Sequence, residues 1–130
     1  MNIVQAEENL KKITTKYSKE SFIFDLMWAY DFPKATISRL QKGSLDKAKN
    51  ENEVVLKKKF YFISTSKKDL DSIFEKAIKD NSILKHDPRF IIVTDNQSLK
   101  AYDTKVGEKL DTEIKTLSKH PDFFLPWAGI

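Results

Sequence analysis

The feature that most constrains the fold is the unbroken apolar run at residues 90–93, Phe-Ile-Ile-Val. Short runs of β-branched and aromatic residues are typical of a strand that is covered on both faces. Pro88 precedes the run, where a strand can begin without losing a ladder hydrogen bond. Asp95 and Asn96 follow it, and both tolerate the left-handed backbone of a tight turn. We therefore expect a central strand, a turn and a half-buried returning strand over residues 99–102.

A second strand is predicted over residues 53–64, EVVLKKKFYFIS. Alternation along a single strand divides its side chains between two faces. One face would carry Val54, Leu56, Lys58, Phe60 and Phe62, and the other Val55, Lys57, Lys59, Tyr61 and Ile63. Lys58 would then be the sole charge on an apolar face. Two interpretations remain open: an edge strand whose lysines reach water, or a remnant nuclease site in which Lys57 and Lys59 contact phosphates.

A helix is predicted between these two strands. Ser66 is the expected N-cap, with Asp69 three residues later. The helix then carries an apolar stripe at helical spacing and ends near Asn81. The stripe consists of Leu70, Ile73, Phe74, Ala77 and Ile78. A strand, a helix and a strand in this order predict two parallel strands with a right-handed crossover.

Helices are also expected before residue 43. The first covers residues 2–17, and the second begins at Ser18 or Ser21 and is broken by Pro33. A third helix covers residues 34–42 and ends at Gly43, a residue suited to the position after a helix. Residues 44–52 are polar and predict a loop.

The C-terminal part has two distinct segments. Residues 110–120 predict a short helix or an irregular edge element. The tail contains Phe123, Phe124 and Trp127, a set that would be costly to expose. It either packs back on the domain or meets a segment outside this sequence. The abrupt aromatic end favours a fragment of a longer chain, in which these three residues would form an interdomain contact.

Length and composition narrow the class of protein. The 130 residues suit a single domain of the α/β (α+β) class. The chain has no cysteine, which excludes disulfides and thiolate metal sites. No apolar run approaches the ~20 residues that span a bilayer, and the polar N-terminus does not resemble a signal peptide. We therefore expect a cytoplasmic protein without a membrane partner.

The charge balance permits DNA binding but does not strongly favour it. Lysine and arginine number 23 against 19 acidic residues, and the net charge is +4. Arg39 and Arg89 are the two arginines, and arginine is the residue preferred for bidentate contacts to guanine and phosphate. Base readout is therefore not expected from this chain.

Familiar catalytic motifs are absent from the sequence. Three glycines are too few for a phosphate-binding loop or a dinucleotide fingerprint, and no G-x-S-x-G elbow occurs. His86 and His120 stand alone without an evident partner and are expected on the surface or in loops. These observations predict no metal site.

Three segments carry a resemblance to a known family: residues 43–62 (GSLDKAKNENEVVLKKKFYF), 88–95 (PRFIIVTD) and 122–129 (DFFLPWAG). With the order of helices and strands, they resemble the N-terminal domain of large bacterial single-chain restriction-modification enzymes. In those enzymes one polypeptide joins a nuclease-type domain, a helical spacer, an adenine-specific DNA methyltransferase and a target-recognition domain. The resemblance covers essentially the whole chain.

The resemblance implies a restriction-endonuclease-like core, a mixed sheet with flanking helices. In that family an Asp precedes a Glu-x-Lys tripeptide, and the two acids hold a divalent metal that activates water. Asp46 matches the Asp and Lys58 matches the Lys, but Leu56 falls at the Glu position. Leucine cannot bind a metal, so the motif is incomplete. Glu20 is a weaker candidate for a carboxylate supplied from outside the motif.

The resulting hypothesis is a degenerate nuclease fold that is retained for DNA contact or interdomain assembly. Lys57, Lys59, Arg39 and Lys42 are its candidate DNA contacts, and binding should be weak and independent of sequence. An active Mg²⁺-dependent endonuclease domain is one alternative, and a protein-interaction domain without a nucleic-acid role is another.

The methyltransferase itself lies outside this sequence. The chain has no [DNS]-P-P-[YFW] motif and no glycine-rich loop for S-adenosylmethionine. The resemblance therefore assigns that cofactor, and Mg²⁺ if any nuclease activity persists, to the parent chain. DNA and the downstream domains of the parent chain are the expected partners.

Overall fold

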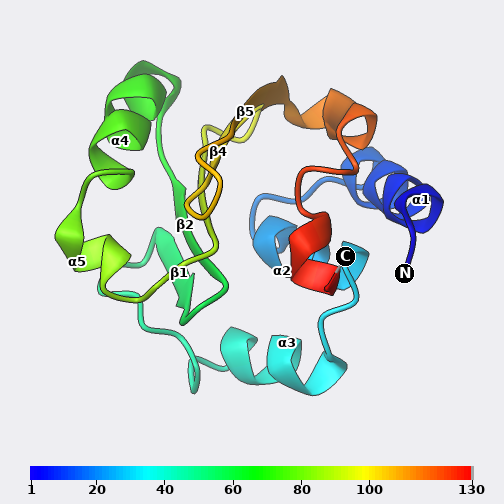
Figure 1. The fold of residues 1–130 in the computed structure, drawn as a ribbon, viewed down its shortest axis with the longest axis horizontal. Helices are drawn as coiled ribbons and strands as arrows, with labels where there is room; N and C mark the ends of the chain where they lie inside the picture. Colours follow the sequence, from blue (N-terminus) through cyan, green and yellow to red (C-terminus); the bar gives the residue numbers. More distant parts are fainter. Residues whose placement is uncertain (130) are drawn as a thin grey trace. The chain divides into compact units, whose positions relative to one another are not determined.

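The computed structural model describes residues 1–129, which form two compact units (Figure 1). One unit combines Met1–Leu45 with the segment that begins at Glu113, and it is helical. The other unit, Asp46–Thr112, contains a sheet with its own helices. The chain is therefore of the mixed α/β class, as predicted.

The helical unit begins with three α-helices. They are α1 (Ile3–Thr15), α2 (Phe22–Ala29) and α3 (Lys34–Gln41). The side chain of Asn2 accepts a hydrogen bond from the Gln5 amide, and the side chain of Gln5 accepts one from the Asn2 amide, which closes a capping box. Ser21, rather than Ser18, is the residue that precedes α2. All three predicted N-terminal helices are confirmed.

The C-terminal tail packs within this helical unit. It follows the 3-10 helix η2 (Ile114–Lys119) and contains a second one, η3 (Leu125–Ala128). Phe124 and Trp127 are buried, and their rings lie 5.8 and 6.0 Å from the ring of Tyr30. The Tyr30 hydroxyl donates a hydrogen bond of 2.8 Å to the carbonyl of Pro121. The first of the two alternatives for the tail is therefore observed for Phe124 and Trp127.

The sheet has five strands in the order β1-β2-β3-β4-β5. These are β1 (Glu53–Leu56), β2 (Phe60–Ser64), β3 (Phe90–Thr94), β4 (Ser98–Asp103) and β5 (Lys109–Glu113). The strands β2 and β3 run parallel, as the strand–helix–strand pattern predicts. β1 and β4 are antiparallel to their neighbours β2 and β3. In the region predicted as a short helix or irregular edge element, an edge strand precedes η2.

The single strand predicted over residues 53–64 is wrong. Residues 57–59 form a turn, so that β1 and β2 make an antiparallel hairpin in which Leu56 faces Phe60. The predicted division of the side chains between two faces is still correct. Leu56 and Phe60 pair in the hairpin and therefore point to the same face of the sheet. In a continuous strand they would also share a face, because they are four residues apart. The predicted position of Lys58 on an apolar strand face is wrong, because Lys58 lies exposed in the turn with a positive φ of 70°.

One face of the sheet carries the core of its unit. Tyr61, Ile63, Ile91 and Val93 pack against the apolar stripe of α4 (Leu70–Ala77). The predicted cap is present, since the Ser66 hydroxyl accepts a hydrogen bond from the Asp69 amide at the start of η1 (Lys67–Asp69). A short helix, α5 (Asn81–Leu84), then leads into β3. The side chains of the opposite face, such as Phe60, Ile92 and Leu99, are buried as well.

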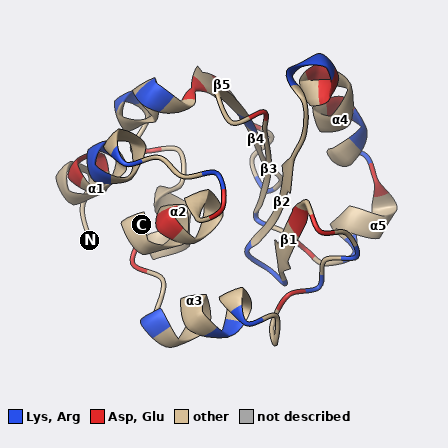
Figure 2. Cartoon of the chain, turned by 180° about the vertical axis from the view of Figure 1, so that it is seen from behind, with Lys and Arg blue, Asp and Glu red and all other residues tan. Residues whose placement is uncertain are grey.

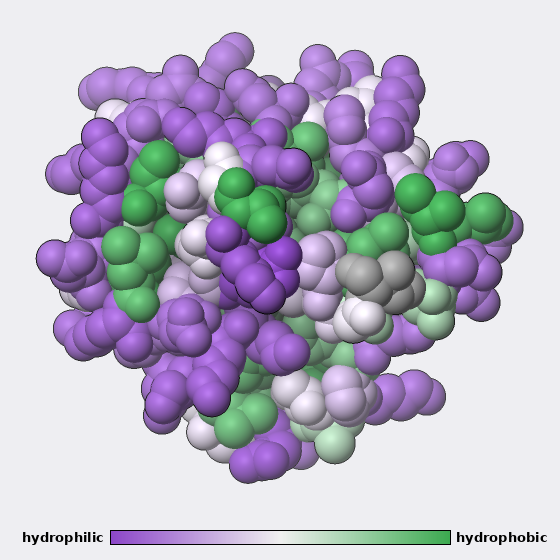
Figure 3. All heavy atoms as spheres, viewed as in Figure 1, coloured by the Kyte–Doolittle hydropathy of each residue, from purple (hydrophilic) through white to green (hydrophobic). Residues whose placement is uncertain are grey.

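The face of the molecule displayed in Figure 3 is mostly hydrophilic, with apolar atoms in separate patches. The large apolar residues that are clearly exposed are Ile3, Val4, Trp28 and Val106. Within residues 1–129, no helix has the length and apolar character that crossing a membrane requires.

Candidate nucleic-acid interface

Asp46 supports the backbone of the sheet unit. Its Oδ1 atom accepts hydrogen bonds of 2.9 Å from the amides of Ala48 and Val55. Its backbone also forms an antiparallel bridge with Leu56, and the Lys47 amide donates to the Val55 carbonyl at 2.9 Å. The carboxylate of Asp46 therefore has a structural role, because it anchors the loop before β1 against the hairpin.

Lys58 occupies the tip of the hairpin. Its amide donates a hydrogen bond of 2.9 Å to the carbonyl of His86, and the Lys59 amide donates to the Leu56 carbonyl at 2.9 Å. The side chains of Lys57, Lys58 and Lys59 are all exposed. Hence Lys58 faces solvent instead of supporting a nucleophile within an apolar face.

The residues that match the nuclease motif do not fit a metal ion. Leu56 offers no ligand atom, and Asp46 Oδ1 already accepts two amide hydrogen bonds. Among the residues that the structure describes, no three acidic or histidine side chains gather in a way that could hold a metal. Asp46 and Leu56 therefore do not form the metal-binding pair that the nuclease motif requires.

The remaining predicted site residues belong to the helical unit. Arg39 on α3, Lys42 after it and Glu20 before α2 are all exposed. A hydrogen bond with the backbone of Glu20 itself and one of 3.0 Å from the Ser18 hydroxyl hold the pKa of the Glu20 carboxyl below its ordinary value. These three side chains belong to the helical unit, whereas Asp46 and Lys58 belong to the sheet unit.

The structure does bring together basic side chains that are scattered in the sequence. We define the lysine cluster as Lys47, Lys49, Lys57, Lys58, Lys59 and Lys85, all of which are exposed. They come from the loop before β1, the β1–β2 turn and the end of α5, and Figure 2 marks the turn and the loop in blue beside acidic stretches in red.

His86 reports the electrostatic environment of the lysine cluster. Partial burial and the positive charge of neighbouring lysines lower the pKa of its imidazole. The lysines concerned are Lys85, Lys49, Lys47 and Lys57. A region where added positive charge is disfavoured is one where an anion is favoured. The positive charge of these lysines therefore favours an anion, such as a phosphate group, near His86.

A pocket of about 210 Å³ opens beside His86. Lys47 and Lys49 line it together with Glu53, Tyr61 and Asp80. The Tyr61 hydroxyl donates a hydrogen bond of 2.5 Å to Glu53 Oε2. Burial, the hydrogen bond to Glu53 and the nearby acidic charge raise the pKa of Tyr61 above its ordinary range. The phenol is therefore a fixed donor and no candidate base at neutral pH.

Sequence reasoning missed the residues of this pocket. Lys47 and Lys49 lie in what reads as an ordinary polar loop, and His86 has no sequence neighbour that marks it as special. The signal that could have found them is the hairpin itself, because its turn meets the His86 carbonyl. A turn built from three lysines lacks the Gly, Asn or Asp that normally reveals a hairpin.

Comparison with known proteins agrees with the resemblance seen in the sequence. The family model described as "MmeI, N-terminal domain" matches residues 1–130. The chain is 35% identical over 130 residues to DNA methyltransferase A of Bacillus subtilis (strain 168). It spans 15% of the length of that relative. No solved structure matches the chain. The chain belongs to the family of MmeI N-terminal domains.

Proposed function

We propose that this domain is the N-terminal module of a longer restriction-modification DNA methyltransferase, in which it contacts the DNA backbone without cutting it. The observation that carries the proposal is the positive charge of Lys47, Lys49, Lys57 and Lys85 around His86, together with the hydrogen bond from the Lys58 amide to the His86 carbonyl. The family and the relative named a DNA methyltransferase make DNA the natural polyanion for such a surface.

Lysine chemistry predicts how this contact would behave. Each lysine is a compact point charge on a flexible stem, which neutralises a phosphate without demanding a fixed orientation. Sequence is read instead through base edges, most often by arginine. Arg89 is engaged with Asp103, and no arginine belongs to the lysine cluster. Binding should therefore be weak, dependent on salt and indifferent to sequence.

A degenerate nuclease ancestry is part of the proposal. The parallel pair β2 and β3, joined through α4, is compatible with a restriction-endonuclease-like core. The motif positions have taken other tasks: Asp46 anchors a loop, Leu56 is largely buried and Lys58 forms a turn. On this view the fold is kept as a scaffold for DNA contact and for assembly with the parent chain.

We propose that the methyl donor binds elsewhere in the parent chain. Gly43, Gly107 and Gly129 lie at separate turns with positive φ, which supports this assignment because a glycine-rich loop for S-adenosylmethionine needs neighbouring glycines. In the aromatic tail, the half-buried Phe123 is the residue we propose for contact with downstream domains. Phe124 and Trp127 are already used in the helical core.

The proposal is tested by measuring the affinity of the 130-residue chain for duplex DNA as salt is varied. Each neutralised phosphate steepens the log–log salt dependence by ~0.9. The triple variant Lys57→Gln, Lys58→Gln, Lys59→Gln should flatten the slope by up to about 2.7. Its matched control is Lys11→Gln, Lys12→Gln, Lys16→Gln, which removes the same charge from exposed lysines of α1 and the residue after it.

Two results would contradict the proposal. A salt-independent or undetectable interaction with DNA would favour a protein-interaction domain. Equal effects of the turn variant and the α1 control would show that net charge alone, and not the lysine cluster, sets the affinity. A second experiment addresses cleavage: plasmid nicking with Mg²⁺ or Mn²⁺ that is abolished by Asp46→Asn would overturn the non-catalytic assignment and establish an endonuclease.

A further inference from the structure

The pocket beside His86 has features that binding of duplex phosphates does not use. Its volume of about 210 Å³ is smaller than the ~300–1,000 Å³ of sites for drug-sized ligands. It therefore suits one small ring system. Apolar side chains contribute to its lining, namely Ala48, Val55 and Ile83. A flat phosphate-binding surface would need no such apolar recess.

The polar lining offers both signs of charge. Lys47, Lys49 and His86 supply positive charge for an anionic group. Asp80 supplies an acceptor, and hydrogen bonds from the Ser82 hydroxyl and amide hold the pKa of Asp80 below its ordinary value. These bonds, of 2.7 and 2.8 Å, both reach Asp80 Oδ1. Asp80 thus stays ionised at neutral pH and can accept from an amino group.

Glu53 has a different role in the pocket. Its Oε1 accepts hydrogen bonds from the amide and the side chain of Asn50 at 3.1 and 3.0 Å, and its Oε2 accepts from Tyr61. Because both oxygens already have donors within the protein, Glu53 shapes the wall of the pocket. Asp80 is consequently the acid best placed to recognise a ligand.

We propose that this pocket binds one unpaired nucleotide, with its phosphate held by Lys47 and Lys49 and an amino-bearing base facing Asp80. A nucleotide has three features that match the lining of the pocket. Its phosphate matches the lysines, its flat ring matches the apolar side chains, and the hydrogen-bond donors on the ring edge match Asp80. Carboxylates accept from the amino group of cytosine, whereas thymine has no amino group. The pocket should therefore prefer cytosine or adenine to thymine.

The inference rests on the proposed DNA contact, because it makes an unpaired nucleotide of that DNA the ligand. A free nucleotide has the same chemistry, so the test must separate the two sources. Neither source requires the β1–β2 turn, whose three lysines do not line the pocket. Lys47 and Lys49 belong to both sites, but the turn lysines belong to the duplex contact alone and Asp80 to the pocket alone, so changes at these positions disable the two sites separately.

The chain offers a built-in probe, since His86 and His120 are its two histidines. His86 lines the pocket and belongs to the sheet unit, whereas His120 belongs to the helical unit. We would titrate the 130-residue chain with dCMP, dAMP, dTMP and inorganic phosphate and follow both imidazole signals by NMR. Nucleotide binding should move the His86 signal and raise the pKa of His86, because a bound dianion favours the imidazolium form. The His120 signal should not move.

Two substitutions separate the two ends of the ligand. Lys49→Gln should weaken dCMP and dTMP equally, by about tenfold, which is the loss expected for one charge-assisted hydrogen bond. Asp80→Asn should bring dCMP down to the affinity of dTMP and leave dTMP unchanged. Asparagine also caps helices well, so the start of α5 is preserved in this variant. The control is Lys68→Gln, which removes an exposed lysine that does not line the pocket.

The source of the nucleotide is decided with oligonucleotides. A duplex with a single-stranded cytosine overhang should move the His86 signal, whereas a blunt duplex should not. If dCMP binds and the overhang does not, the pocket serves free nucleotides and the DNA assignment is overturned. Phosphate binding as tightly as dCMP, or a His120 shift as large as that of His86, would overturn the pocket altogether. The proposed function is tested by a different measurement. It fails if substitution of the β1–β2 turn lysines leaves duplex binding unchanged.

Discussion

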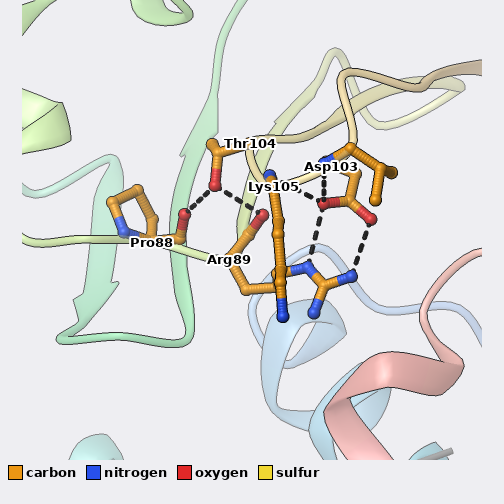
Figure 4. A network of polar contacts seen from close by, with 6 residues as sticks. Pro88, Arg89, Asp103, Thr104 and Lys105 are labelled. Carbon is orange, nitrogen blue, oxygen red and sulfur yellow. Dashed lines mark hydrogen bonds and ion pairs between the residues drawn. The ribbon is translucent and has the colours of Figure 1, made fainter.

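Arg89 and Asp103 clamp the open end of the β3–β4 hairpin through two parallel hydrogen bonds (Figure 4). Arg89 Nε lies 2.9 Å from Asp103 Oδ1, and Arg89 Nη2 lies 3.0 Å from Asp103 Oδ2. The Thr104 hydroxyl adds a bond of 2.6 Å to the Pro88 carbonyl. Asp103 is 4% exposed, so this ion pair is screened little by water. The pair connects the residue before β3 to the last residue of β4.

The first prediction concerns the loss of this clamp. Arg89→Ala should lower the free energy of unfolding by about 3 kcal/mol, because it removes the cation from the buried carboxylate of Asp103 and leaves it only the amides of Lys105 and Val106 as donors. Arg89→Lys keeps the charge but loses the two parallel hydrogen bonds of the guanidinium group. Its free energy of unfolding should therefore lie between those of Arg89→Ala and the wild type. Urea unfolding measures both. Lys105→Ala changes an exposed neighbour and should stay within about 0.5 kcal/mol of the wild type. A similar loss in that control would show that the effect is not specific to the clamp.

The same pair predicts a dependence of stability on acid pH. Burial alone would raise the pKa of Asp103, but hydrogen bonds from Arg89 and the amides of Lys105 and Val106 outweigh it and lower the pKa. The stabilisation is therefore complete above the unfolded-state pKa of ~3.9 and is lost as pH falls through the lower folded-state pKa. In Asp103→Asn, the free energy of unfolding should depend less on pH below about 4. Parallel pH profiles for the two proteins would refute this.

A second pH effect is expected on the alkaline side. Burial raises the pKa of Tyr30 and Tyr61 above the usual range, and the hydrogen bond and charge of Glu53 add to this at Tyr61. The unfolded chain releases these protons near pH ~10 while the folded chain retains them, so stability should fall as pH rises above ~10. Tyr61→Phe should reduce that slope. Tyrosinate absorbance provides an independent check, since the protons of Tyr30 and Tyr61 should be released only together with unfolding.

The final prediction concerns the aromatic tail. Phe124 is fully buried in the helical unit and stacks on Trp127 with ring centroids 4.9 Å apart. Phe124→Ala should destabilise the chain by about 3–5 kcal/mol. Phe123 is half-buried, so Phe123→Ala should cost clearly less. Thermal unfolding of the two variants provides the comparison. Equal losses would mean that the tail does not have the packing seen here.

Several elements were predictable because local chemistry and the tertiary structure agree. The cap at Ser66 follows from a hydroxyl side chain at a helix start. The apolar stripe of α4 required a sheet face to cover it, and that face carries Tyr61, Ile91 and Val93. The parallel pairing of β2 and β3 follows from the helix that joins them.

The β1–β2 hairpin was not predictable from local sequence. No Gly, Asn or Asp marks the turn at residues 57–59, and Lys58 adopts a positive φ that lysine rarely takes. Alternation could not distinguish the two arrangements, because folding back at Lys58 leaves the same residues on each face. The mistaken strand placed Lys58 in an apolar environment and gave the nuclease motif more support than it has.

By itself, the sequence determined the three N-terminal helices, the parallel strand pair with its connecting helix, and the family, since each depends on residue type and spacing along the chain. Tertiary structure alone decided where the charges meet. The Lys58 amide reaches the His86 carbonyl across 28 positions of sequence, and Asp46 ties the loop of Lys47 and Lys49 to β1. Such contacts satisfy backbone groups whose partners are distant in sequence, so no local pattern records them.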